Sequence, residues 1–220
     1  MKKTILAAMA VMLTLSAGAA TAKKDSVNPN KPVFTVIKQN PITSIKNQNR
    51  SGTCWDYSTL SFFEAEILKN TGKTYDLSEA FVANKTYMDR AIQVVRLHGD
   101  CQFSQGGSCY DPLYCIQHYG IVPETAMAKT GSQYGDSLFN FNEFFNVMTP
   151  YVEAVAKSDA KKLSPAWKNG LQGILDSYLG KCPKQFTYQG KSFTPKSFAA
   201  AIGLDSAACN NYVSFTSYTH

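Results

Sequence analysis

Residues 48–57 read QNRSGTCWDY and place a cysteine, Cys54, between a glycine-containing turn and a tryptophan. Apolar residues at helical spacing follow the cysteine as far as Gly72, so the sequence predicts a helix over residues 54–72. The apolar positions are Trp55, Leu60, Phe63, Ile67 and Leu68. A cysteine that begins a helix lies beside backbone N–H groups without partners in the helix, and these groups favour the thiolate. The stretch therefore predicts a nucleophilic thiol at Cys54.

Gln48 lies six residues before this cysteine. Its side-chain amide can donate a hydrogen bond toward the same point as the backbone N–H of Cys54. Two such donors would form an oxyanion hole, the feature that stabilises a tetrahedral intermediate in acyl transfer. Acyl transfer through a thioester needs these parts together with an imidazole base.

The rest of the sequence predicts a mainly helical chain with one β-hairpin. Ser78 is the expected N-cap and Gly99 the stop of a second helix, and Asp111 is the expected N-cap of a third. Gln189 and Gly190 are expected to form the turn of a β-hairpin. The further predicted elements are helices at 76–99, 111–120, 138–158 and 164–180 and a hairpin at 186–193.

The first 22 residues have the pattern of a secretory signal peptide. Two lysines precede an apolar run that ends in Ala20-Thr21-Ala22, so the mature chain is expected to begin at Lys23. The apolar run is short and is followed at once by two lysines, which argues against a stable membrane anchor. The sequence thus predicts export to the periplasm or the extracellular space.

The charge pattern argues against a nucleic-acid partner. The net charge is +6 over 220 residues, but the basic residues are scattered and form no stripe or known module. The sequence also contains no CxxC pair and no HExxH, so neither zinc nor another cofactor is expected.

The chain has six cysteines, which in an exported protein indicates three disulfides. The alternative is two disulfides, one buried thiol and one working thiol. Cys101–Cys109 and Cys182–Cys209 are local pairs that the spacing would allow.

The segment QNRSGTCW resembles the active-site segment of papain-like cysteine peptidases, in which a glutamine is followed after five residues by Cys-Trp. The form Ser-Gly-x-Cys-Trp is most similar to the bleomycin hydrolase and aminopeptidase C branch. Three further segments resemble that family in the same order along the chain. They are LSEAFV at 77–82, SQGGSCYDPLYCIQHYGIVPE at 104–124, and 176–218, which resembles part of a helical and hairpin insertion over about 137–218.

The resemblance implies a role for each matching residue. Cys54 would be the nucleophile and Gln48 the oxyanion donor, while Gly106 and Gly107 would offer backbone hydrogen bonds to an extended peptide substrate. Trp55 would pack beneath the site. Papain itself has a disulfide at the two positions that are serine here, Ser51 and Ser104.

The resemblance also implies a catalytic histidine and an asparagine before Ser-Trp or Ala-Trp, and neither context occurs in this sequence. His98 is interpreted as a helix C-terminal cation, His118 as a surface or packing residue, and His220 has nothing after it to orient its ring. The resemblance therefore implies an α+β, papain-like fold. We expect residues 23–220 to be the N-terminal portion of that domain, mainly its helical half plus the insertion, without the β-rich half. Such a chain would be inactive alone.

The resemblance implies an exported thiol-dependent peptidase of aminopeptidase type that cleaves peptides through an acyl-enzyme at Cys54. Relatives form hexamers, so a homo-oligomer is an expected partner. One alternative is a non-catalytic peptide-binding or inhibitory module of the same fold. Another is a secreted domain in which Cys54 is one half of a disulfide.

Overall fold

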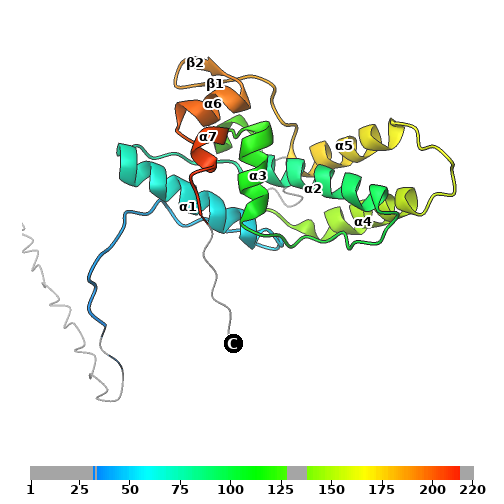
Figure 1. Cartoon of the computed structure of the whole chain (residues 1–220), viewed down its shortest axis with the longest axis horizontal. Coiled ribbons are helices and arrows are strands. Elements are labelled where there is room, and N and C mark those ends of the chain that lie inside the picture. Colours follow the sequence, from blue (N-terminus) through cyan, green and yellow to red (C-terminus); the bar gives the residue numbers. More distant parts are fainter. Residues whose placement is uncertain (1–31, 33, 128–137, 214–220) are drawn as a thin grey trace, which may run out of the picture. The chain divides into compact units, whose positions relative to one another are not determined.

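The helix expected at Cys54 forms and carries the candidate site (Figure 1). In the computed structural model, α1 runs over Cys54–Thr71. It ends at Gly72, whose left-handed φ of 70° lets its N–H donate to the carbonyl of Leu68. The structure describes residues 32, 34–127 and 138–213, and the predicted signal peptide lies outside them.

The chain divides into two compact units, Met1–Gln39 and Asn40–His220, and the second contains all the elements described below. No helix in the described part of the chain is long and apolar enough to cross a membrane.

The second and third helices form close to their predicted positions. α2 covers Glu79–Arg96, and Ser78 is its N-cap as expected, accepting a hydrogen bond from the N–H of Phe81. α3 covers Tyr110–Tyr119 and has Cys109 as its N-cap, so the expectation that Asp111 would be the cap is wrong. The carboxylate of Asp111 instead turns back and accepts the N–H of Ser108 at 2.7 Å.

The C-terminal part of the chain alternates helices with one hairpin. Strands β1 and β2 pair antiparallel, and Gln189 and Gly190 both have positive φ (48° and 75°), as the predicted two-residue turn requires. The sequence did not predict α6 or α7, although Thr194 forms a capping box at the start of α6. The remaining elements are a 3-10 helix at Glu124–Ala126, α4 (Phe141–Ala156), α5 (Ala166–Leu179), β1 (Phe186–Tyr188), β2 (Lys191–Phe193), α6 (Pro195–Ala201) and α7 (Ser206–Cys209).

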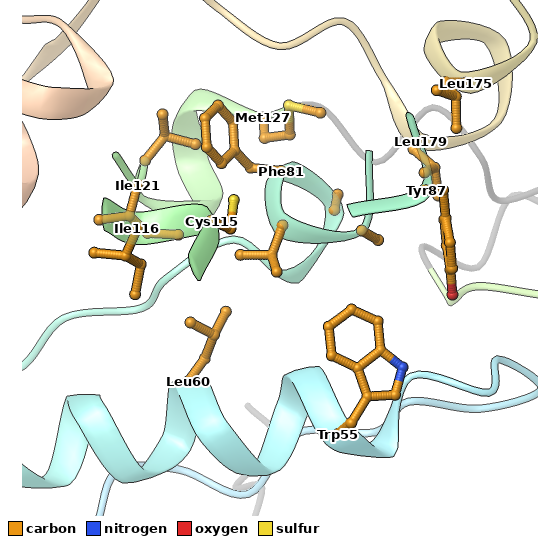
Figure 2. Close-up of a cluster of buried hydrophobic side chains, with 14 of the residues drawn as sticks. Trp55, Leu60, Phe81, Tyr87, Cys115, Ile116, Ile121, Met127, Leu175 and Leu179 are labelled. Atoms are coloured by element: carbon orange, nitrogen blue, oxygen red, sulfur yellow. The ribbon is translucent and has the colours of Figure 1, made fainter. Parts of the chain in front are cut away.

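Helix α2 lies at the centre of the second unit and packs against α1, α3, α4 and α5. Figure 2 shows Trp55 and Leu60 of α1 directed at the same interior as Phe81 of α2 and Cys115 of α3. Tyr87 of α2 is fully buried and meets a cluster of aromatic rings. Those rings are Trp55, Phe103, Phe141, Phe144 and Phe145. Burial of each such side chain stabilises the fold by roughly 1.5–3 kcal/mol, so the start of α1 is anchored by this core.

The expected disulfides do not form, and all six cysteines are free thiols in the structure. Cys209 is buried in α7, where its thiol donates to the carbonyl of Leu204 at 3.8 Å. Cys182 follows α5 and packs against the core, and burial raises its pKa to about 11. Each of these two thiols thus lies in its own local packing site, which sequence spacing does not reveal.

One partly buried ion cluster joins three segments of the chain. The ammonium of Lys46 lies 2.9 Å from Glu64 of α1 and 2.8 Å from Glu79 of α2. It also donates to the carbonyl of Leu77 and lies 2.7 Å from Asp76. Burial by itself would lower the pKa of Lys46, but the carboxylates around the ammonium outweigh it and raise that pKa above its usual value.

We predict that Lys46→Met destabilises the protein by about 3–5 kcal/mol, because two carboxylates whose side chains are 1% and 3% exposed lose their counter-ion. Urea unfolding at pH 7, followed by tryptophan fluorescence, measures the change. Lys69→Met is the control: it removes an exposed ammonium 3.4 Å from Glu66 and should change stability by less than about 0.5 kcal/mol. Equal effects of the two substitutions would contradict a structural role for the cluster.

Candidate active site

Cys54 is the first residue of α1, and its side chain is exposed. The N-cap residue Thr53 makes no side-chain capping bond, and its hydroxyl lies 2.6 Å from the hydroxyl of Ser51. Its carbonyl accepts the N–H groups of Asp56 and Tyr57 at 3.0 and 3.1 Å. The helix start therefore has no side-chain cap, and the thiol lies at its positive pole.

Gln48 belongs to a tight turn that leads into this helix. Its amide nitrogen donates to the carbonyl of Ser51 at 2.7 Å, and the Ser51 hydroxyl donates back to the carbonyl of Gln48 at 2.8 Å. Asn49 completes the turn with a left-handed φ of 50°. A primary amide has two N–H donors, so one remains for another acceptor while the first holds the side chain in place.

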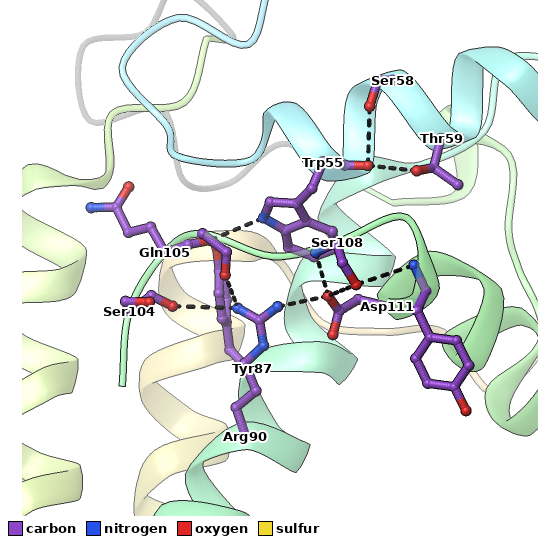
Figure 3. A network of polar contacts seen from close by, with 11 residues as sticks. Trp55, Ser58, Thr59, Tyr87, Arg90, Ser104, Gln105, Ser108 and Asp111 are labelled. Carbon is purple, nitrogen blue, oxygen red and sulfur yellow. Dashed lines mark hydrogen bonds and ion pairs between the residues drawn. The ribbon is translucent and has the colours of Figure 1, made fainter. Parts of the chain in front are cut away.

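The Gly106–Gly107 loop is joined to the Cys54 segment through Gln105 (Figure 3). The Gln105 carbonyl accepts the indole N–H of Trp55 at 3.0 Å, and its side-chain oxygen accepts the N–H of Gly52 at 2.8 Å. Trp55 is 5% exposed, in agreement with the packing role expected for it. Sequence reasoning missed Gln105, although its position directly before two glycines was a usable signal.

Gly107 lies so close to its neighbours that it has no room for a side chain. A Cβ at this position would meet the Trp55 ring at 2.7 Å and would also overlap the guanidinium of Arg90. A Cβ on Gly106 would meet no atom within 4 Å. Close packing therefore requires a glycine at position 107 but not at position 106.

Asp56 is fully buried directly after Trp55, and neither of its carboxyl oxygens has a hydrogen-bond partner in the part of the chain that the structure describes. Burial, together with the negative charge of Glu79, raises the pKa of Asp56 well above its usual value. The ammonium of Lys46 opposes this shift, and Asp111 of α3 adds to it. A protonated Asp56 avoids the large cost of an unpaired buried charge.

The histidines of the described chain do not join this site. His118 stacks on Tyr114 of its own helix at 3.8 Å between ring centroids, with Nδ1 3.0 Å from the Tyr114 carbonyl. His98 follows the end of α2 in a left-handed conformation and is exposed. His220 lies outside the described residues. Within those residues there is also no cluster of three or more His, Cys, Asp or Glu side chains that would hold a metal ion.

The Cys54 thiol is exposed at a helix start without a side-chain cap, and the turn that contains Gln48 precedes it. Gln105 joins the glycine loop to Gly52 of this turn and to Trp55. Cysteine-dependent acyl transfer uses an exposed thiol and nearby N–H donors, together with an imidazole base. A model of the papain family of cysteine proteases matches residues 32–164, and the chain belongs to that family.

Individual relatives agree with this assignment. Cysteine proteinase 2 of Entamoeba histolytica is 29% identical over 143 residues, which are 62% of this chain and 40% of that protein. Aminopeptidase C of Listeria monocytogenes is 26% identical over 214 residues, covering 82% of this chain and 47% of that protein. The latter match supports the resemblance to the aminopeptidase C branch.

A solved structure shares the fold. PepW from Lactobacillus rhamnosis superposes with a TM-score of 0.51 at 20% identity, over 78% of this chain and 46% of that one. The expected papain-like fold is confirmed, with its helical part in the described residues. The chain spans less than half the length of each of these three proteins.

We predict that Gly107→Ala destabilises the protein by about 1–3 kcal/mol, because the new methyl group must displace Trp55 or Arg90. Gly106→Ala is the matched control, since its methyl group would enter open space. Thermal unfolding of both variants measures the difference. A Gly107→Ala variant as stable as Gly106→Ala would show that the loop can move away from Trp55.

A second prediction concerns Asp56 and pH. The pKa of Asp56 is raised in the folded protein, so its contribution to stability is complete below about pH 4. As the pH rises, this contribution is lost by up to about 1.4 kcal/mol per pH unit, until the carboxyl of the folded protein ionises. Asp56→Asn removes this titration. The stability of the variant relative to wild type should therefore increase between pH 5 and pH 7 in urea unfolding.

Asp100→Asn, at an exposed position, is the control and should keep a constant difference from wild type over the same range. A constant difference for Asp56→Asn as well would mean that Asp56 does not retain its proton when buried.

Proposed function

We propose that the protein is an exported cysteine-type peptidase of aminopeptidase type, with Cys54 as its nucleophile. The observation that carries the proposal is the position of the Cys54 thiol, exposed at the uncapped first residue of α1. The proposal of export rests on residues 1–22, which resemble a signal peptide.

In the proposed reaction the Cys54 thiolate attacks the scissile carbonyl carbon. A C–S bond forms, and the carbonyl electron pair moves to the oxygen, which accepts hydrogen bonds from the Cys54 N–H and the free amide N–H of Gln48. Collapse of this intermediate breaks the C–N bond, and an imidazolium gives its proton to the leaving amine. Water then hydrolyses the thioester and restores the thiol.

The imidazole base of this reaction is proposed to come from sequence beyond residue 220. Neither His98 nor His118 hydrogen-bonds to Cys54 or Gln48 in the described residues, and the His118 ring is held against its own helix. Gly106 and Gly107 are proposed to bind the peptide backbone of the substrate. Aminoacyl specificity is suggested by the relative named aminopeptidase C.

We predict that Cys54→Ser lowers hydrolysis of an aminoacyl coumarin amide by at least about 10³-fold, because the thiolate nucleophile is lost. The measurement uses protein produced from the complete natural coding sequence. Cys109→Ser is the matched control, since Cys109 is also an exposed thiol at the start of a helix. A free amino terminus on the substrate should be required, so the N-acetylated amide should be cleaved far more slowly.

Alkylation separates this proposal from a binding module. Iodoacetamide at pH 6 should label Cys54 faster than Cys109 if the thiolate is stabilised, as peptide mapping by mass spectrometry would show. Equal labelling, together with peptide binding and no hydrolysis, would replace the peptidase with a non-catalytic peptide-binding module.

A further inference from the structure

Arg90 of α2 connects the glycine loop with the helix that begins at Cys54. Its guanidinium donates to the carbonyl of Gly106 and, at 3.4 Å, to that of Ser104. It also lies 2.9 Å from the carboxylate of Asp111, and its centre is 5.1 Å from the centroid of the Trp55 ring. Figure 3 shows Arg90 extending from α2 toward Ser104, Asp111 and Trp55.

The bond to the Gly106 carbonyl fixes the orientation of one peptide plane. In a trans peptide unit the carbonyl of residue 106 and the N–H of residue 107 point in opposite directions. When Arg90 holds the Gly106 carbonyl toward α2, the Gly107 N–H must point away from α2. No acceptor for that N–H occurs in the described residues.

The same guanidinium also anchors the end of the loop. Asp111, its ion-pair partner, accepts the N–H and the hydroxyl of Ser108 at 2.7 and 3.3 Å. Arg90 therefore holds the loop directly at Gly106 and, through Asp111, at Ser108. The peptide unit between these anchors carries the free Gly107 N–H.

We propose that Arg90 is the positioning residue of the substrate loop: it orients the Gly106–Gly107 peptide so that the Gly107 N–H can bind a backbone carbonyl of an extended peptide. This inference rests on the proposed function of the loop. The planar fork of arginine serves several acceptors at once, whereas the single ammonium of lysine cannot reproduce that geometry.

The space around Arg90 permits a chemical test. A hollow of about 380 Å³ lies between α2 and α3 and is lined by Arg90, Arg96, Tyr110 and Tyr114 among others. A second, of about 210 Å³, is lined by Arg90, Ser104 and Gly106 among others. Removal of the Arg90 side chain would connect its site with this space, so a small guanidinium ion could enter.

The experiment compares two reagents that alkylate Cys54, using protein from the complete coding sequence. Gly-Phe chloromethyl ketone must bind as a peptide before the thiolate displaces chloride and forms a thioether, so its inactivation saturates with a constant KI. Iodoacetamide reports the reactivity of the thiol without peptide binding. Wild type, Arg90→Ala, Arg90→Lys and Arg96→Ala are compared, with Arg96 as an exposed control on the same hollow.

We expect both Arg90 variants to raise KI by roughly 10-fold or more, while the iodoacetamide rate changes less than about twofold, because only peptide binding depends on the orientation of the loop. Methylguanidinium at tens of millimolar should restore part of the KI of Arg90→Ala. Arg96→Ala should behave as wild type. If Arg90→Ala does not fold, as judged by circular dichroism, Arg90→Lys decides the question.

Unchanged KI in a folded Arg90 variant would overturn the inference. An equal loss of reactivity toward both reagents would also overturn it, because Arg90 would then support the fold and not the loop. If wild type shows no saturation with the peptide reagent, the proposed peptide site itself fails, and that result is independent of Arg90.

Discussion

The partly buried ammonium of Lys46 is the constraint on which the arrangement around Cys54 depends. A cation partly removed from water needs close counter-charges, and here they come from Glu64 of α1 and Glu79 of α2. The cluster can form only when both helices and the segment before Gln48 meet. It therefore sets the position of the candidate nucleophile and its oxyanion donor relative to α2, the central helix of the unit.

Asp56 differs from Glu64 and Glu79, because it is a buried carboxyl with no cation beside it in the described residues. Its carboxyl is as buried as that of Glu64 but lacks any hydrogen-bond partner in the described chain, and burial raises its pKa. It lies two residues after Cys54. The unpaired buried carboxyl of Asp56 thus destabilises the fold next to the proposed catalytic residue. Functional sites commonly keep such destabilising groups.

The glycine loop is shaped by contacts from three directions. Gln105 binds the turn before α1 and the indole of Trp55, while Arg90 binds the carbonyl of Gly106 from α2. The absence of a side chain at Gly107 allows Trp55 and Arg90 to approach the backbone. The loop and the start of α1 therefore act as one assembled surface, although about fifty residues separate them in the chain.

Local sequence is enough to predict the helix that begins at Cys54 and stops at Gly72, the N-cap at Ser78 and the hairpin turn at Gln189–Gly190. Each of these depends on neighbouring residues and on φ preferences. It also indicated the family through ordered motifs. The folded chain was needed to show that the six cysteines are free thiols and that Gln105 and Arg90 hold the glycine loop. These features arise from contacts between segments far apart in the chain, which no local pattern encodes.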